Sequence, residues 1–228
     1  MMNKKPIILS MPSSGSDLFA ECVSTELSLS YFKKEFFNPI TNLVMHDQLI
    51  AGRFACETYR GMSNIGIPLN SVGNQILEEN KDRFGLYKEV FWMGKIDSYI
   101  KFFNPIILVR SKKSLFPPSR LRVLQWYDCF SDNRNESFLK NVEQGFDNLL
   151  NHCKEVSEKH NIPILSHDEL LNEGDTTARE EIRKWIGSDK VEEILERFQK
   201  NYRRPNKDEI MFPVGYCEKQ NRLIIKGS

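Results

Sequence analysis

Residues 7–19 read Ile-Ile-Leu-Ser-Met-Pro-Ser-Ser-Gly-Ser-Asp-Leu-Phe, and this stretch decides the fold. A short apolar run ends at Ser10, a tight turn follows through Pro12 and Gly15, and a helical pattern begins near Ser16. In such a strand–turn–helix unit the N–H groups of the turn point inward, and the helix N-terminus adds partial positive charge. The stretch therefore predicts an anion-binding turn in an α/β domain, although an ordinary turn with a serine cap has the same pattern.

The composition is that of an ordinary globular domain. The chain has 228 residues, of which 40% are hydrophobic and 28% are charged. Its net charge of +1 gives no signal for nucleic acid, so an anion site must come from a local group of cations. No apolar run is long enough for membrane insertion, and no cysteine spacing suits a metal or a disulfide framework. We expect a cytoplasmic protein without a bound metal and with free thiols at Cys22, Cys56, Cys129, Cys153 and Cys217.

Strands and helices alternate along the chain. Apolar runs predict four strands, over residues 6–10, 87–93, 105–110 and 162–166. Helical periodicity predicts six helices, over residues 16–30, 96–103, 119–130, 136–160, 176–186 and 189–201. The alternation indicates a three-layer α/β fold of the P-loop-NTPase-like type, in which helices flank a central, mostly parallel sheet. We expect one domain over residues 1–228.

Two stretches lie outside this alternation. Residues 35–80 are irregular and rich in Asn, Gly and Pro, and a long irregular stretch in a compact domain is usually functional. We therefore place the acceptor-binding loops at residues 38–80. Residues 202–228, with a late apolar run, form a C-terminal extension.

Charged residues follow the predicted strands. In an open parallel sheet, ligands bind at the carboxyl ends of the strands. Lys95 follows the second strand, Arg110 follows the third, and the run His167-Asp168-Glu169 follows the fourth. This edge of the sheet would then combine three groups: a turn rich in N–H groups, a lysine and an arginine. Together they suit a nucleotide with several phosphates. The turn is neither a Walker A loop nor a dinucleotide fingerprint, because it lacks the glycine and lysine spacing of both.

The turn resembles the 5′-phosphosulfate loop of sulfotransferases, whose pattern is roughly [ST]-x-P-[KR]-[ST]-G-[ST]. The matching residues are Ser10, Pro12, Ser14, Gly15 and Ser16. Ser13 stands where the family usually has a cation. The stretch from Asn104 to Ser119 is similar to the second signature of the family, in which a strand-end arginine and a serine eight residues later hold the 3′-phosphate. Arg110 matches, whereas Ser119 follows it by nine residues and requires a one-residue insertion, with Ser114 as a second choice.

Two further elements resemble the same family. Gly94-Lys95 is similar to the strand-end lysine of the carbohydrate-type branch, and residues 162–171 are similar to the fourth strand and the turn after it. The resemblance thus touches four separate elements in the right order, over residues 6–185.

The resemblance implies transfer of a sulfuryl group from 3′-phosphoadenosine-5′-phosphosulfate to a hydroxyl or amine of a small-molecule or carbohydrate acceptor, without a metal. It implies that Lys95 stabilises the transferred group and that a carboxylate or histidine accepts the acceptor's proton, with Glu35 as first choice and His46 as second. The residues implied for nucleotide binding are Ser13, Ser14, Gly15, Ser16, Asp17, Arg110 and Ser119.

Two alternatives remain open. Because Ser13 replaces the usual loop cation, the chain could bind a nucleotide without turnover, as a silent interaction module. It could also be another phosphate-handling enzyme such as a nucleotide kinase, although a Walker lysine and an obvious pair of aspartates for magnesium are absent from the sequence.

Overall fold

The computed structural model describes most of the predicted sheet and its helices. The described residues are 4–12, 14–31, 77–90, 96–111, 138–172 and 174–202, together with the backbone of 214–217 and 222–225. The helix expected over 119–130 and nearly all of the stretch 38–80 lie outside these residues.

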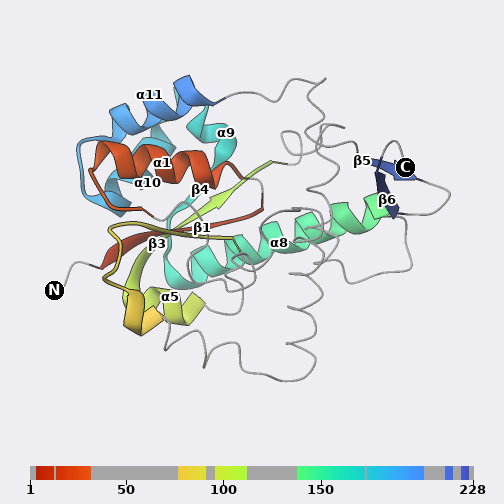
Figure 1. The fold of residues 1–228 in the computed structure, drawn as a ribbon, viewed down its shortest axis with the longest axis horizontal. Coiled ribbons are helices and arrows are strands. Elements are labelled where there is room, and N and C mark those ends of the chain that lie inside the picture. The colour runs from red at the N-terminus through yellow and green to blue at the C-terminus, as the bar shows by residue number, and fades with distance from the viewer. Residues whose placement is uncertain are drawn as a thin grey trace.

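Four parallel strands form the central sheet (Figure 1). They are β1 (Lys5–Ser10), β2 (Tyr87–Glu89), β3 (Phe103–Val109) and β4 (Ile164–Ser166), in the order β2-β1-β3-β4. The two central strands, β1 and β3, pair along their whole shared length, from Lys5 opposite Phe103 to Ser10 opposite Leu108. The expectation of a parallel sheet is thus confirmed, and β1 and β3 end side by side.

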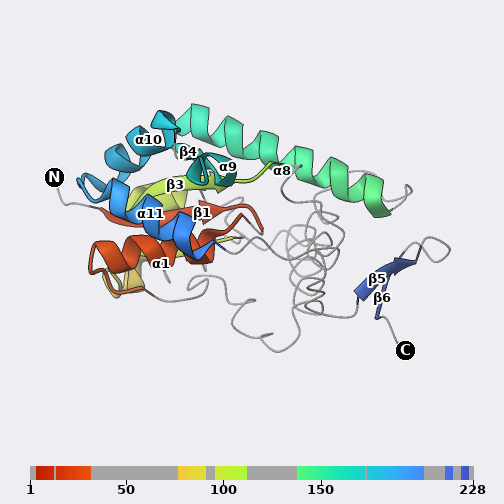
Figure 2. The same ribbon diagram turned by 90° about the horizontal axis from the view of Figure 1, so that it is seen from above.

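Helices cover both faces of this sheet (Figures 1 and 2). On one face lie α1 (Ser16–Glu26), the short α9 (His167–Leu170), α10 (Thr176–Ile186) and α11 (Val191–Asn201). On the other face lie α5 (Ile96–Phe102) and α8 (Phe138–His160). Successive side chains of a strand point to opposite faces, so Ile8 packs in the α1 layer and Ile7 and Leu9 pack in the α8 layer. The fold is therefore α/β with three layers.

Two predicted boundaries are wrong by four residues each. The first helix ends at Glu26 instead of residue 30, because Ser28 takes a left-handed backbone conformation with φ 52°. The second strand ends at Glu89 instead of residue 93, and Val90 is already in a bend. β2 pairs only with β1, and Glu89 lies opposite Leu9, one residue before β1 itself ends. β2 therefore stops one residue before β1 does, where the bend at Val90 takes the chain out of the sheet.

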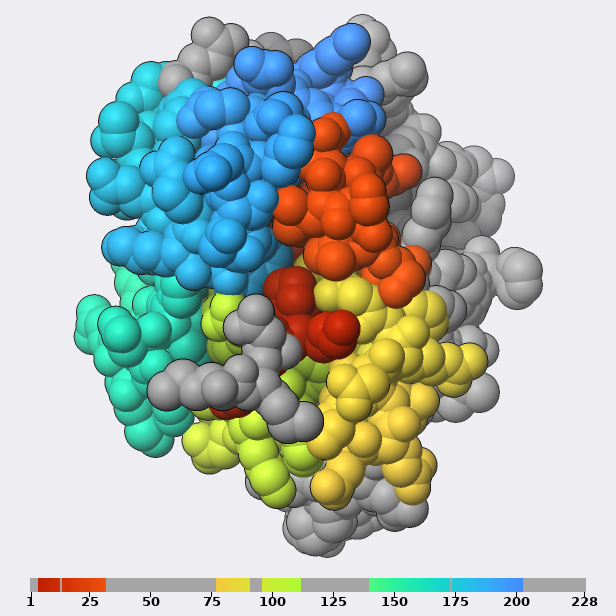
Figure 3. Space-filling model, turned by 90° about the vertical axis from the view of Figure 1, so that its left-hand side faces the viewer, coloured from red at the N-terminus to blue at the C-terminus, as the bar shows by residue number. Residues whose placement is uncertain are grey.

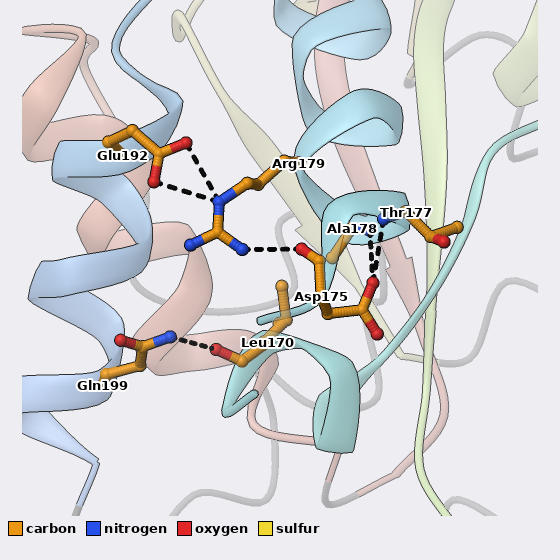
Figure 4. A network of polar contacts seen from close by, with 7 residues as sticks. All are labelled: Leu170, Asp175, Thr177, Ala178, Arg179, Glu192 and Gln199. Carbon is orange, nitrogen blue, oxygen red and sulfur yellow. Dashed lines mark hydrogen bonds and ion pairs between the residues drawn. The ribbon is translucent and has the colours of Figure 1, made fainter. Parts of the chain in front are cut away.

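Side-chain contacts fix the helices of the α1 layer to one another (Figure 4). Asp175 caps α10, because its Oδ1 atom accepts hydrogen bonds from the N–H groups of Thr177 and Ala178 at 2.9 and 3.2 Å. Arg179 donates from Nε to both carboxylate oxygens of Glu192 on α11, each at 3.0 Å. A further bond runs from Gln199 Nε2 to the carbonyl of Leu170 at 3.1 Å. These contacts hold the last turn of α11 near the end of β4.

Figure 3 shows the edge of the sheet at which the parallel strands begin. There the start of β1 lies between two groups of elements: α1, α10 and α11 on one side, and residues 77–90 with α5 on the other. Near this edge Trp185 donates from Nε1 to the carbonyl of Asn104 at 2.8 Å, and Asn104 Nδ2 donates to the carbonyl of Trp185 at 2.7 Å. This pair joins α10 to β3. Farther along the chain, β5 (Val214–Cys217) and β6 (Arg222–Ile225) form an antiparallel pair within the predicted extension.

Candidate anion-binding site at the carboxyl edge of the sheet

The chain leaves the two central strands in opposite directions. After β1 it passes through α1 to Tyr31, which makes a parallel bridge with Leu86, the residue before β2. After β3 it leads through α8 to β4, on the other side of the sheet. A reversal of this kind between neighbouring strands is the topological switch point at which open α/β sheets bind ligands. The candidate site therefore lies between the carboxyl ends of β1 and β3.

The turn after β1 stays close to β3. The Met11 N–H donates to the carbonyl of Leu108 at 2.9 Å, so the turn begins two residues from Arg110. The Ser14 N–H then donates to the carbonyl of Met11 at 3.3 Å, and Gly15 takes φ +82° as the N-cap of α1. Glycine suits this position because other residues rarely adopt a positive φ. The N-cap has no side chain to accept from the first turn of α1, so these N–H groups are available to an anion.

The polar side chains of the turn are buried. Ser14 is fully buried, and its Oγ atom has no hydrogen-bond partner among the residues that the structure describes. Ser16, the first residue of α1, is also buried. A buried hydroxyl without a partner costs free energy, so the Ser14 hydroxyl is suited to a bound anion that accepts its proton. The buried hydroxyl of Ser14 and the uncapped N-terminus of α1 are independent signs of the same kind of ligand.

A buried lysine lies beside the turn, and the sequence analysis missed it. Lys88 on β2 is opposite Ile8 in the sheet, so its side chain points into the α1 layer. Only 2% of the Lys88 side chain is exposed, and its Nζ atom donates to Asp17 Oδ1 at 2.5 Å. Asp17 is the second residue of α1, and its side chain is 77% exposed. A lysine within a predicted buried strand was the available signal, because lysine is almost never fully buried without a partner.

Arg110 directly follows β3 on the same side. Ile106 and Leu108 pack in the α1 layer, and the alternation of the strand carries Arg110 toward that layer as well. Arg110 is only 4% exposed, and its Nη2 atom lies 3.0 Å from the hydroxyl of Tyr202, the residue that ends α11. Beyond it, the N–H of Ser111 donates to Asp168 Oδ2 at 3.2 Å, which fixes the chain next to β4.

Two aromatic side chains connect the turn to Arg110. His167, the first residue of α9, is fully buried, and a β-carbon on Gly15 would lie 2.8 Å from its Cδ2 atom. The His167 ring meets the Tyr202 ring edge to face, with 4.7 Å between the centroids. The contacts thus run from Gly15 through His167 and Tyr202 to Arg110. The turn and the guanidinium share one face of the sheet, and a ligand that reaches both must lie along these two rings.

The other face of this edge carries a buried carboxylate. Glu89, the last residue of β2, is fully buried, and its carbonyl accepts from Ser10 Oγ at 3.4 Å. Burial and the charge of Glu89 raise the pKa of Tyr99 on α5 well above its usual value. Lys88 and Glu89 therefore place opposite charges on opposite faces of β2, and only Lys88 lies on the side of the turn.

The structure thus brings together five of the predicted site residues: Ser14, Gly15, Ser16, Asp17 and Arg110. It leaves the others, Ser13, Glu35, His46, Lys95 and Ser119, outside the described residues. The sequence analysis assigned no role to Lys88 or Tyr202. Tyr202 gave no local signal, because its contact with Arg110 joins positions 92 residues apart.

Within the described part of the chain, no three His, Cys, Asp or Glu residues form a group that could hold a metal ion. None of the described helices combines the length and the apolar character needed to cross a membrane. Comparison with known proteins gave no match to a family model, a curated protein or a solved structure. The site is therefore interpreted from its own geometry.

Proposed function

We propose that the chain is a sulfotransferase of P-loop-like fold that uses 3′-phosphoadenosine-5′-phosphosulfate as donor. The observation that carries the proposal is the position of the Gly15 turn and of Arg110. Both directly follow adjacent parallel strands at the switch point, and both lie on the α1 face of the sheet. A turn with open N–H groups suits the 5′-phosphosulfate, and a buried guanidinium suits the 3′-phosphate.

In the proposed reaction the acceptor oxygen or nitrogen forms a bond to sulfur. The bond from sulfur to the bridging oxygen of the 5′-phosphate breaks at the same time, and that oxygen keeps the electron pair. The acceptor's proton passes to Glu35 or His46. The products are the sulfated acceptor, a small molecule or carbohydrate, and adenosine 3′,5′-bisphosphate. Positioning and charge stabilisation supply most of the acceleration, as in phosphoryl transfer.

Lys88 supplies the cation that the turn lacks at Ser13. Its ammonium lies at the first turn of α1, where negative charge on the leaving oxygen would develop. Asp17 holds this ammonium in the absence of a ligand, and the donor's anionic groups compete with Asp17 for it. We therefore assign to Lys88 the stabilisation of the leaving oxygen, beside the role proposed for Lys95 at the transferred group.

The first test is binding of adenosine 3′,5′-bisphosphate, measured by isothermal titration and by thermal unfolding. A ligand at 100 times its dissociation constant adds about 2.7 kcal/mol to the free energy of unfolding. Arg110→Ala should weaken binding of the bisphosphate strongly. Arg183→Ala is the matched control, because Arg183 is exposed on α10. The absence of binding by the native chain, or equal effects of the two substitutions, contradicts the proposal.

The second test separates the enzyme from its alternatives. The native chain is incubated with 3′-phosphoadenosine-5′-phosphosulfate and a panel of hydroxyl and amine acceptors, with and without excess chelator. Sulfated product that forms equally in chelator supports a sulfotransferase. Bisphosphate binding without any transfer favours a silent nucleotide-binding module. Phosphoryl transfer from a nucleoside triphosphate that stops in chelator favours a kinase.

A further inference from the structure

Tyr202 occupies a defined position next to Arg110. It ends α11, and its N–H donates to the carbonyl of Phe198 at 2.9 Å. Its ring lies edge to face on His167 and stacks with Phe198 at a centroid separation of 6.1 Å. These contacts hold the ring from two sides, while the residue as a whole remains only half-buried. The hydroxyl is therefore fixed in place and still close to the surface.

The hydrogen bond between these two residues has only one direction. A guanidinium carries donors and no acceptor, so Arg110 Nη2 donates to the Tyr202 oxygen across 3.0 Å. This bond does not use the proton of the Tyr202 hydroxyl, which stays available to a second acceptor. The positive charge that donates to the phenol oxygen also polarises its O–H group, which makes that group a stronger donor.

We infer that the Tyr202 hydroxyl is a ligand of the same phosphate that Arg110 binds. Two donors 3.0 Å apart, one of them cationic, converge on a single anionic group. This assignment rests on the proposed function, in which Arg110 holds the 3′-phosphate of the donor. It gives the end of α11 a direct part in nucleotide binding, and it gives the phosphate a second donor next to Arg110.

The competing explanation is that Tyr202 only holds the guanidinium in place. Adenosine 3′,5′-bisphosphate and adenosine 5′-monophosphate separate the two roles, because the monophosphate lacks the group that the pair is inferred to bind. Tyr202→Phe removes the hydroxyl and keeps the ring against His167 and Phe198. Tyr31→Phe is the matched control, because Tyr31 is half-buried and lies next to Leu86, before β2, away from Arg110.

The experiment measures the affinity of the native chain and of each variant for both nucleotides by isothermal titration, with unfolding curves of the free proteins as a check on the fold. A hydrogen bond to a charged group corresponds to about tenfold or more in affinity. Tyr202→Phe should lower the affinity for the bisphosphate by that factor and leave the affinity for the monophosphate unchanged. Tyr31→Phe should change neither affinity.

Two outcomes overturn the inference and leave the proposed function standing. In the first, Tyr202→Phe binds the bisphosphate as tightly as the native chain does, while Arg110→Ala no longer binds it. In the second, Tyr202→Phe lowers the affinity for both nucleotides equally.

If the native chain binds neither nucleotide, the proposed function fails, and inorganic phosphate then decides the inference. Weaker phosphate binding by both Tyr202→Phe and Arg110→Ala supports it. Unchanged or absent phosphate binding overturns it.

Discussion

Gly15 and His167 are 152 positions apart in the sequence, yet in the fold the α-carbon of Gly15 lies against the imidazole ring of His167. A β-carbon on Gly15 would stand 2.8 Å from His167 Cδ2 and 3.2 Å from Nε2. The candidate anion-binding turn therefore packs against the start of α9, directly after β4. Glycine meets two requirements here, a positive φ and the lack of a side chain.

Replacement of Gly15 should destabilise the protein for both reasons. In Gly15→Ala, the left-handed conformation costs about 1–2 kcal/mol, and the collision with His167 adds about 1–3 kcal/mol. Gly187→Ala is the control, because Gly187 has φ +61° and no atom within 4 Å of its added β-carbon. It should lose only the conformational term. Urea unfolding of both variants checks the difference, and equal losses would show that the His167 contact is unimportant.

Substitution of Lys88 should separate catalysis from binding. If Lys88 stabilises charge that develops during transfer, Lys88→Met should lower kcat about 100-fold or more. Its affinity for the donor 3′-phosphoadenosine-5′-phosphosulfate should change less, because the bridging oxygen of the intact donor does not yet carry the charge that develops during transfer. Steady-state kinetics and titration of the same preparation measure the two quantities. A parallel loss of affinity and kcat would instead give Lys88 a role in ground-state binding.

Neutralisation of Asp17 should strengthen anion binding. The Asp17 carboxylate accepts from Lys88 and repels a bound phosphate, so Asp17→Asn removes both the competitor and the repulsion. Because the side chain is exposed, the screened interaction is on the order of 1 kcal/mol or less, and affinity for the bisphosphate should rise about twofold to fivefold. Asp189→Asn, at an exposed position before α11, should leave the affinity unchanged. A loss of affinity in Asp17→Asn would show that Asp17 positions Lys88 for the ligand.

Alkaline pH should destabilise the fold through Cys153. Burial raises the pKa of this thiol on α8 from 9.0 to about 12. Between these values the unfolded chain has lost the proton and the native chain still binds it. The contribution to stability is therefore complete below pH 9 and declines as the pH rises toward 12, by about 1.4 kcal/mol per unit. Cys153→Ala should have a shallower decline in urea unfolding at pH 9–11 under reducing conditions. Equal slopes for both proteins would contradict the assignment.

Trp185 should contribute to stability through one hydrogen bond. Trp185→Phe keeps an aromatic ring against Phe19 and removes the Nε1 donor, which leaves the carbonyl of the half-buried Asn104 without that bond. The loss should be about 1–3 kcal/mol in the free energy of unfolding. Thermal and urea unfolding measure it. A change below about 0.5 kcal/mol, the range of ordinary surface substitutions, would show that water replaces the indole.

Local patterns predicted most elements correctly. The helix over 176–186 matches α10 in its bounds, because Asp175 caps its first turn and apolar side chains recur along one face. The run from Pro105 was correctly interpreted as a buried central strand, although β3 begins earlier, at Phe103. Pro105 is tolerated there because β4 pairs only with Ile107–Val109 and leaves that side of Pro105 without a strand neighbour. The cap of α10 and the apolar patterns behind both predictions act within a few residues.

The second strand shows where local patterns fail. Tyr87 to Met93 is apolar enough for a long strand, yet β2 contains only Tyr87–Glu89. Its length depends on the pairing with β1, which stops at Leu9, and nothing within residues 87–93 encodes that point. The predicted strand-end cation, Lys95, lies outside the described residues, and the lysine that the structure places beside the turn is Lys88.

The amino-acid sequence by itself determined the alternation of strands and helices, the glycine turn after β1 and the arginine after β3. These depend on apolar periodicity, capping and backbone sterics, all of which act between near neighbours. The tertiary structure alone decided that Lys88 meets Asp17, that His167 lies against Gly15 and that Tyr202 meets Arg110. Such pairs arise because the sheet register and the packing of α9 and α11 bring distant segments to one edge, and no short stretch of chain carries that information.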